Sequence, residues 1–220
     1  MTRLIEESVE IGVVDYGMGN RRSVEKALEH VGASAVVSAD PDLLRATAGL
    51  VVPGVGAFPR AMQRLHERGL DELVREHVRA GRPVLGICLG MQLAFDSSTE
   101  MGGAPGLGIV AGEVHALETG GLKLPHIGWN EVSFTRPGSP LVAELPPRCA
   151  FYHVHSYAPE PAVAQDTLGI AEYGKPFVSM VQSGSFYGVQ FHPEKSSAAG
   201  LRLLANFARI CIEAGAPVAR

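Results

Sequence analysis

The sequence predicts an α/β protein with a doubly wound, mostly parallel sheet that is flanked by helices and carries an antiparallel extension. Three observations lead to this prediction. Short apolar runs alternate with amphipathic helical patterns before Met101, and glycine-rich turns follow several of those runs. After Met101 the pattern changes to short β-prone segments between glycine or proline turns. A length of 220 residues with 46% hydrophobic residues suits a single domain, residues 1–220.

The first half predicts alternating strands and helices. We expect helices at 20–31, after Asp40, at about 58–80 and at 91–95, and strands at 11–15, 34–37, 50–52 and in the segment leading to Cys88. Right-handed crossovers would join these strands into a parallel sheet. The turns that follow the strands would then share its carboxyl edge.

The second half predicts strands at 108–117, 131–135, 149–157, 167–173, 177–181 and 185–190. A closing amphipathic helix at 199–213 carries an apolar stripe that would pack against the sheet. Residues 1–9 form an N-terminal extension without an assigned role, and 214–220 are expected to be a frayed tail.

Composition narrows the classes of partner. The net charge is −4, and lysine and arginine are scattered, which argues against nucleic acid and against a membrane surface. No apolar run approaches spanning length, and because residues 1–10 carry acids instead of a basic segment we expect no secretory signal. Three cysteines at wide spacing fit neither a disulfide framework nor a zinc site and favour a reducing, cytoplasmic location. Partners should be small molecules or proteins.

Cys88 is the leading candidate for a nucleophile. It stands between Gly86-Ile87 and Leu89-Gly90, at the junction of a predicted strand and a predicted helix. A strand-to-helix turn this tight strains its central residue and needs neighbours without a Cβ. The helix that follows would direct its positive end toward the sulfur and favour the thiolate. The alternative is a small buried hydrophobe at the end of a strand.

A base and its orienting acid follow the last predicted strand. His192 and Glu194 are two residues apart, with Pro193 between them. On an extended chain such residues face one side about 6.6 Å apart, so the carboxylate could hold one imidazole nitrogen while the other addresses a thiol. A structural histidine and a solvated glutamate are the alternative; only the conjunction with Cys88 makes a triad.

Two further glycine-rich turns follow predicted strands. Backbone N–H groups of 53–58, together with that of Leu89, could bind an oxyanion in acyl transfer, although an ordinary turn would have the same composition. The turn at 16–20 suggests a dinucleotide fingerprint, but Arg22 occupies the place of its third glycine, and the acid expected after the second strand is missing.

These segments together resemble the class I glutamine amidotransferases. Within that class the chain is similar, nearly end to end, to the glutaminase subunits of imidazole glycerol phosphate synthases. Four motifs carry the resemblance: Asp15–Asn20, Pro53–Phe58, Pro125–Asn130 and Phe191–Ser196.

The resemblance implies a reaction. Cys88 would attack the side-chain amide of glutamine, His192 would pass a proton to the leaving ammonia, and Glu194 would orient His192. Water would hydrolyse the γ-glutamyl thioester, with no cofactor and no metal. The implied oxyanion loop is Gly54 and Val55, to which we add Leu89. The implied glutamine-holding residues are Gly56, Gln92, Ser156 and Tyr157, of which a helical Gln92, one turn after Cys88, would share its face.

The resemblance also implies a protein partner. Ammonia would pass to a cyclase with a (β/α)₈ barrel, in a heterodimer that makes imidazole glycerol phosphate and an aminoimidazole carboxamide ribotide in histidine biosynthesis. Sequestration preserves ammonia's reactivity, because free ammonia is mostly protonated in neutral water. The implied docking residues are Asn20, Pro125, Trp129 and Lys195; otherwise Trp129 would be core packing and Lys195 a solvated lysine.

Two residues depart from the family pattern, and three other functions compete. Arg21 and His153 stand where apolar or aromatic residues are usual. The alternatives are the glutaminase of another synthase, a cysteine hydrolase of another kind, and a non-catalytic scaffold. The partner-facing motifs argue against the first, the close spacing of His192 and Glu194 against the second, and the intact triad against the third.

Overall fold

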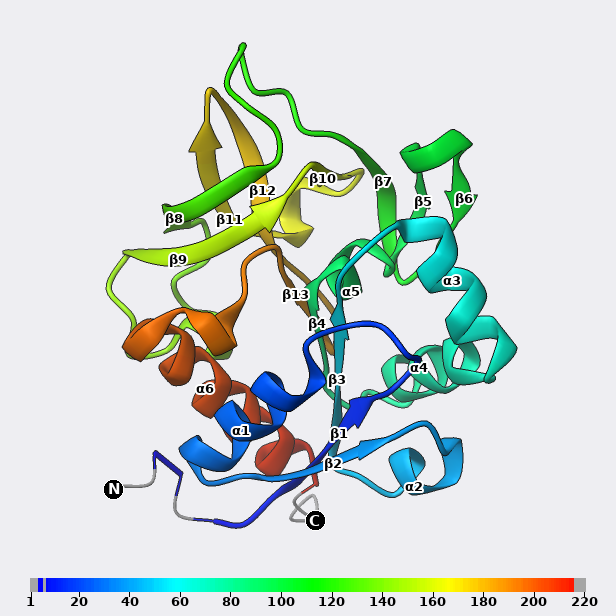
Figure 1. Cartoon of the computed structure of the whole chain (residues 1–220). Coiled ribbons are helices and arrows are strands. Elements are labelled where there is room, and N and C mark those ends of the chain that lie inside the picture. The colour runs from blue at the N-terminus through cyan, green and yellow to red at the C-terminus, as the bar shows by residue number, and fades with distance from the viewer. Residues whose placement is uncertain (1–3, 6, 216–220) are drawn as a thin grey trace.

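The computed structural model describes residues 4, 5 and 7–215 and contains two sheets (Figure 1). One half of the larger sheet is parallel, in the order β2-β1-β3-β4-β13. Its other half continues antiparallel from β13 through β12, β11 and β8 to β9. The parallel strands are β1 (Glu10–Val14), β2 (Ser34–Ser38), β3 (Gly49–Gly54), β4 (Val84–Cys88) and β13 (Phe186–Val189).

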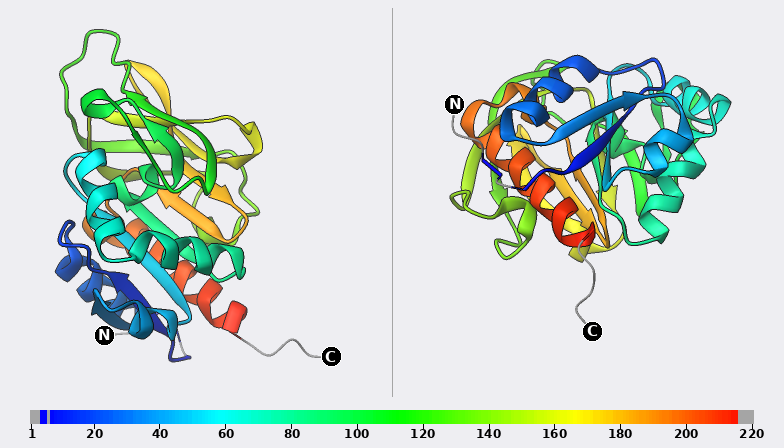
Figure 2. Two further views of the ribbon diagram at one scale, coloured as in Figure 1. Left: turned by 90° about the vertical axis from the view of Figure 1, so that its right-hand side faces the viewer. Right: turned by 90° about the horizontal axis from the view of Figure 1, so that it is seen from below.

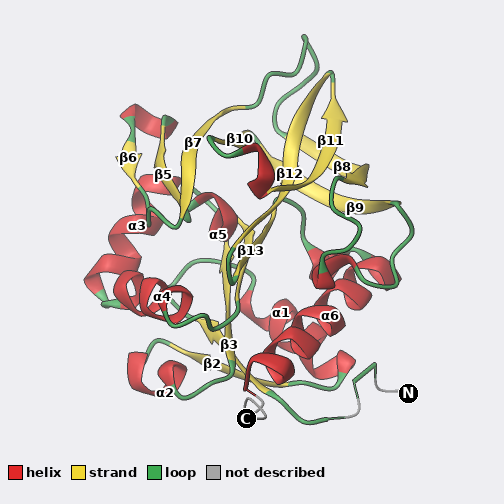
Figure 3. Cartoon of the chain, turned by 180° about the vertical axis from the view of Figure 1, so that it is seen from behind, coloured by secondary structure: helices red, strands yellow, loops and turns green. Residues whose placement is uncertain are grey.

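The antiparallel strands stand beyond the parallel half, as the view from behind shows (Figure 3). They are β8 (His126–Phe134), β9 (Arg148–His155), β11 (Thr167–Tyr173) and β12 (Lys175–Ser183). A smaller sheet has the order β10-β7-β5-β6 and combines β5 (Phe95–Ser98), β6 (Ala104–Pro105), β7 (Val110–Ala116) and β10 (Tyr157–Pro161). The predicted α/β class with an antiparallel extension is confirmed, whereas β5, β6 and a separate β10 were not expected.

Helices cover both faces of the parallel half (Figures 1 and 2). On one face, α1 (Arg21–Val31) packs against α6 (Ser197–Gly215); on the other lie α2 (Pro41–Arg45), α3 (Phe58–Glu67) and α4 (Leu70–Arg79). In α1 the apolar residues at helical spacing, Val24, Leu28 and Val31, are fully buried. Short 3-10 turns occur at Glu100–Gly102, Pro140–Val142, Ala164–Asp166 and Pro193–Lys195.

Two predicted helices differ from the structure. The expected helix at 58–80 is split into α3 and α4 at Gly69, which adopts a left-handed φ of 65°. Leu65 and Leu70 are both fully buried, so the break lets both helices turn apolar residues to the core. The helix expected at 91–95 is the single turn α5 (Leu89–Gln92), because Phe95 already begins β5 and is buried there.

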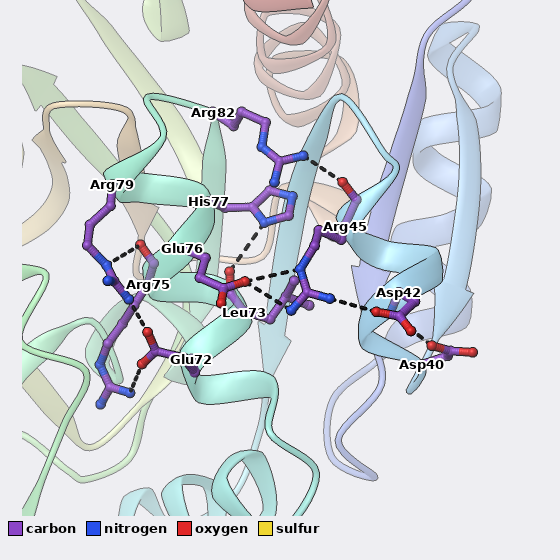
Figure 4. Close-up of polar contacts among 10 residues, drawn as sticks. All are labelled: Asp40, Asp42, Arg45, Glu72, Leu73, Arg75, Glu76, His77, Arg79 and Arg82. Carbon is purple, nitrogen blue, oxygen red and sulfur yellow. Dashed lines mark hydrogen bonds and ion pairs between the residues drawn. The ribbon is translucent and has the colours of Figure 1, made fainter.

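The ion pair between Arg45 and Glu76 joins α2 to α4, and further ion pairs lie within each helix (Figure 4). Arg45 bonds to Glu76 at 3.0 Å and to Asp42 at 2.7 Å, and Arg79 pairs with Glu72. Exposed pairs of this kind contribute about 0–1 kcal/mol each to stability. His77, beneath them, is fully buried and donates through Nδ1 to the Leu73 carbonyl, and burial lowers its pKa to about 4.

The described part of the N-terminal extension is packed. Ile5 and Val9 are buried, the N–H groups of Leu4 and Ile5 donate to the Val31 carbonyl, and Arg209 of α6 donates to the Leu4 carbonyl. The segment therefore joins α1 to α6. Residues 214 and 215, expected in a frayed tail, still belong to α6, and 216–220 lie outside the described residues. Among the described helices, none combines the length and apolar character needed to cross a membrane.

Candidate active site

The turn between β4 and α5 has the strained geometry that the glycines predicted. Cys88 has φ 55° and ψ −113°, an unusual backbone conformation for a residue with a side chain. A Cβ on Gly90 would lie 1.8 Å from the Val52 carbonyl oxygen, and one on Gly86 would lie 2.6 Å from the Gly90 oxygen. Both positions therefore exclude any side chain, and the sharp turn holds Cys88 at the carboxyl end of β4.

The helix after Cys88 contributes less than predicted. Because α5 has only one turn, few aligned peptide dipoles point at the sulfur. The helix therefore contributes little to activation of the thiol, and side chains around Cys88 must supply the activation.

His192 and Glu194 are in contact. Nδ1 of His192 lies 3.1 Å from Oε1 of Glu194, and both side chains are almost completely buried. We predicted an extended strand for this pair, and that prediction is wrong. β13 ends at Val189, and Pro193 starts a 3-10 turn that carries Glu194 back to the imidazole. The backbone of His192 is fixed as well, since its N–H donates to the Tyr152 carbonyl and its carbonyl accepts from Ser196 Oγ.

His192 is a strong base in this setting. Burial opposes its charged form, but hydrogen bonds to Cys88 and to Glu194, with the charges of both, outweigh burial and raise the pKa of His192 to about 9. Glu194 has no hydrogen-bond partner for Oε2 among the described residues, so its interaction with His192 is its main compensation for burial. Cys88, His192 and Glu194 thus form a linked thiol–imidazole–carboxylate set.

A pocket of about 260 Å³ opens above the thiol. It brings together residues from five parts of the chain: Val55, Gly56, Cys88, Leu89, Gln92, Glu100, Val154, His155, Ser156, Tyr157, His192 and Lys195. All four predicted glutamine-holding residues, Gly56, Gln92, Ser156 and Tyr157, therefore line one cavity with the nucleophile. A pocket of this size with a few convergent polar groups suits one amino acid.

Two of the three predicted oxyanion residues, Val55 and Leu89, line the pocket, whereas Gly54 does not. Gly54 is the register partner of Cys88 on β3 and is buried beneath the turn. A Cβ there would lie 2.7 Å from the Tyr16 hydroxyl and 2.8 Å from the Gly90 nitrogen. Gly54 thus allows close packing under the site, and Val55 stands at its open side.

Gln92 is oriented by its own hydrogen bonds. Its Nε2 donates to the Tyr157 carbonyl at 3.0 Å and to Oε1 of Gln190 at 2.9 Å. Both N–H bonds are therefore in use, and only Oε1 remains to accept a bond from a ligand. A primary ammonium group, which carries three donors, is the matching chemistry.

Glu100 was not predicted for this site. It lines the pocket, and its Oε2 accepts a 2.8 Å bond from the N–H of Phe58, at the start of α3. The Glu100 carboxylate thus brings negative charge to the rim of the pocket. Neither a motif nor a spacing marks Glu100 in the sequence, because it reaches the pocket from a 3-10 turn of the unexpected smaller sheet.

Of the four predicted docking residues, Lys195 lines the pocket and the other three do not. Lys195 is exposed and lines the pocket, which puts it beside the triad. Trp129 is 55% exposed on β8 and contacts Tyr152 edge-on, so it is not core packing. Pro125 is exposed before β8, and Asn20 is half-buried at the start of α1.

The two departures from the family pattern are both accommodated. Arg21 forms an ion pair with Asp15, and despite partial burial this contact lowers the pKa of Asp15. His153 is fully buried; its Nδ1 donates to the Phe151 carbonyl at 3.0 Å, and its Nε2 accepts from Ser179 at 2.9 Å. Arg21 therefore does not add an unpaired charge.

Comparison with known proteins agrees with this geometry. The sequence model of the family "Glutamine amidotransferase class-I" matches residues 12–211. The imidazole glycerol phosphate synthase subunit HisH of Moorella thermoacetica is 47% identical over 205 residues, which cover 93% of this chain and 97% of that one. The same subunit of Symbiobacterium thermophilum is 52% identical over 200 residues, covering 91% and 93%. The chain belongs to the class I glutamine amidotransferases, within the HisH family.

The fold of this amidotransferase recurs in solved structures of low sequence identity. PurLQS from Thermotoga maritima superposes with a TM-score of 0.72 at 15% identity, over 94% of this chain and 99% of that one. At this identity the likeness concerns the fold alone. Gly12 to Cys211, the span that the family model matches, includes the whole triad of the amidotransferase.

Proposed function

We propose that this amidotransferase hydrolyses glutamine to glutamate and ammonia at Cys88 and supplies the ammonia to a cyclase. The observation that carries the proposal is the linked set of Cys88, His192 and Glu194 at the base of a pocket sized for one amino acid. Membership in the HisH family supports the same reaction.

In the first step the Cys88 sulfur attacks the side-chain amide carbon of glutamine. His192 donates its proton to the amide nitrogen, the carbon–nitrogen bond breaks, and ammonia leaves a γ-glutamyl thioester. In the second step His192 takes a proton from water, whose oxygen attacks the thioester carbon. The thiolate leaves as glutamate forms, and the two steps together consume one water.

The pocket supplies recognition of the glutamine backbone and stabilisation of charge. Glu100 and Oε1 of Gln92 are acceptors suited to the α-ammonium group, and the N–H groups of Leu89 and Val55 are candidates for the oxyanion. Each oxyanion donor of this type contributes about 10²–10³-fold to rate.

The proposed partner is a (β/α)₈ barrel cyclase that completes imidazole glycerol phosphate in a heterodimer. The relatives named above are subunits of imidazole glycerol phosphate synthase, which supports a partner subunit. Exposed Trp129 and Lys195 are the docking anchors in this proposal, since aromatic and cationic residues often dominate interfaces. All three cysteines are free, which suits a reducing, cytoplasmic setting.

The test compares two nitrogen sources. Cys88→Ala is expected to abolish glutamine-dependent product formation by the complex with the cyclase subunit and to leave synthesis from added ammonium salts intact. Cys149→Ala, at a buried cysteine away from the pocket, is the matched control and should retain both activities. Loss of both activities in the Cys88 variant alone would contradict the proposed division of labour.

A further inference from the structure

A second glutamine lies against the nucleophile. Gln190 follows β13 and is fully buried, between the apolar residues Val189 and Phe191. Its Nε2 lies 3.6 Å from the Cys88 sulfur, within hydrogen-bonding range for sulfur, and its Oε1 accepts the 2.9 Å bond from Gln92. We propose that Gln190 is a further residue of the glutaminase site, which donates a hydrogen bond to the Cys88 thiolate and is held in place by Gln92.

The burial of Gln190 is unexplained by packing alone. A primary amide in the interior costs free energy unless both of its ends are bonded, and an aliphatic residue would fill the same space without that requirement. The backbone N–H of Gln190 is already bonded to the Ser179 carbonyl, so the strand register needs nothing from the side chain. Its amide connects two groups of the site, the Cys88 sulfur and Gln92.

The contacts of the sulfur differ between its two protonation states. As a thiol, Cys88 donates toward the Val154 carbonyl at 3.7 Å. A thiolate has no proton to donate and is repelled by that oxygen, so it needs donors instead. His192 provides one and Gln190 provides the other. Hydrogen bonds to an ionised acceptor are roughly twice as strong as neutral ones, so Gln190 favours the reactive form.

The same chain of bonds connects the nucleophile to the substrate pocket. Gln92 lines the pocket and donates both to Tyr157 and to Gln190. A cation bound at the free Oε1 of Gln92 would polarise its N–H bonds and, through them, the amide of Gln190. This step rests on the proposed function, because it takes glutamine as the ligand.

The test measures the ionisation of Cys88 without relying on glutamine turnover. The full-length chain is alkylated with iodoacetamide from pH 5 to pH 10, and peptide mapping follows Cys88 apart from Cys149 and Cys211. The titratable groups around the sulfur are His192, Tyr16 and His155, with Glu100 and Lys195 at the rim of the pocket. All of them are unchanged in the variants, so differences between the pH profiles report the substituted amide.

Gln190→Met removes the donor at nearly constant volume and should raise the pH midpoint of Cys88 alkylation by about one unit, the size of one charge-assisted bond. Gln92→Met leaves β13 untouched and should raise it by about half as much, because Gln190 loses its support. Gln182→Met, at a half-buried glutamine on β12 that accepts a hydrogen bond from Ser139 before the 3-10 turn Pro140–Val142, should leave the midpoint unchanged. Circular dichroism checks that each variant is folded.

A midpoint for Gln190→Met equal to that of the unsubstituted chain would overturn the proposal, as would an equal rise in the Gln182→Met control. If Gln190→Met does not fold, the Gln92→Met profile decides alone. Glutamate release is measured separately, with the cyclase subunit present. Absence of release by the unsubstituted chain would refute the proposed function, whereas the alkylation profiles would still decide the role of Gln190.

Discussion

The pKa of one buried histidine, His192, is shifted in the opposite direction from those of a cluster of three others. His192 lies at the carboxyl edge of the parallel half, against Glu194 and Cys88, and its pKa is raised to about 9. His126 on β8 lies together with His153 and His155 on β9 in the antiparallel half. Burial lowers the pKa of His153 to about 3 and that of His155 to about 4, and it also lowers the pKa of His126.

The hydrogen bonds of this cluster account for its neutrality. Nδ1 of His155 donates to the Tyr157 carbonyl, so its Nε2 accepts from Nδ1 of His126, and Nε2 of His126 accepts from Asn130. Each ring is satisfied as a neutral tautomer without a carboxylate. Burial therefore makes a histidine a neutral connector by default, and only the carboxylate and thiol beside His192 make it a base.

The largest expected effect on activity comes from removing the carboxylate charge beside His192, which makes its surroundings more like those of His126, His153 and His155. Glu194→Gln keeps the shape of the side chain but removes its charge, so the pKa of His192 should fall from about 9 although Cys88 still raises it, and kcat for glutamine should fall about 10²–10⁴-fold. The pKa is measured by NMR titration of the imidazole carbon protons, and kcat by glutamate release.

Glu172→Gln provides the control for that variant. Its carboxylate is on β11, away from the triad, so both the titration of His192 and the glutamate-release rate should be retained. A Glu194→Gln protein in which His192 still titrates near pH 9 would contradict the assigned role of the carboxylate.

An intermediate effect is expected on stability at acid pH, where the buried, neutral His153 opposes protonation. A histidine with a depressed folded-state pKa contributes stability above its unfolded pKa of 6.5 and loses it as pH falls toward the folded value, here about 3 for His153. Between pH 7 and pH 5 this loss amounts to about 2 kcal/mol for one such group. His153→Phe removes it, so the free energy of unfolding should fall less steeply over that interval.

Urea unfolding at each pH measures this slope. Only the slope is informative, because the variant also leaves Ser179 without its imidazole partner and so loses some stability at every pH. His30→Gln, at an exposed position of α1, serves as the control and should keep the slope of the unsubstituted chain. A His153→Phe slope equal to the control would show that His153 is not held neutral.

The smallest effect is expected on the affinity for the partner subunit, at Lys195 beside the pocket. Lys195→Ala should weaken binding of the cyclase subunit about tenfold, as expected for removal of a charged interface residue, and leave the triad's contacts intact. Titration of the partner with fluorescence detection from Trp129 measures the affinity. Lys26→Ala, on the outer surface of α1, is the matched control; equal affinities for the two variants would remove Lys195 from the docking face.

The parallel half could be predicted because its signals are local. The glycines around Cys88 exclude side chains at the turn, and the apolar runs of β1, β3 and β4 are buried strands. The break at Gly69 was missed because helical periodicity continues on both sides of a single glycine. The turn at Pro193 was missed because two residues of sequence do not distinguish an extended strand from a 3-10 turn.

The rest of the site could not be predicted because its residues come together only in the folded chain. Glu100 reaches the pocket from a 3-10 turn beside the smaller sheet, and Gln190, just after β13, meets Gln92 across 98 residues of sequence. The role of Gly54 in the oxyanion loop stays a prediction, whereas its packing beneath the turn, against Tyr16 and Gly90, was not expected. Long-range packing of this kind leaves no periodic pattern in the sequence.

The most direct test of the Cys88, His192 and Glu194 assignment is to trap the covalent intermediate. The chain is mixed with radiolabelled glutamine in the presence of the cyclase subunit and its ribonucleotide, quenched in acid within one turnover, and digested. We expect acid-stable label on the peptide that contains Cys88 and none in Cys88→Ala. Turnover of glutamine without that label, or label on the peptide of Cys149 or Cys211, would contradict it.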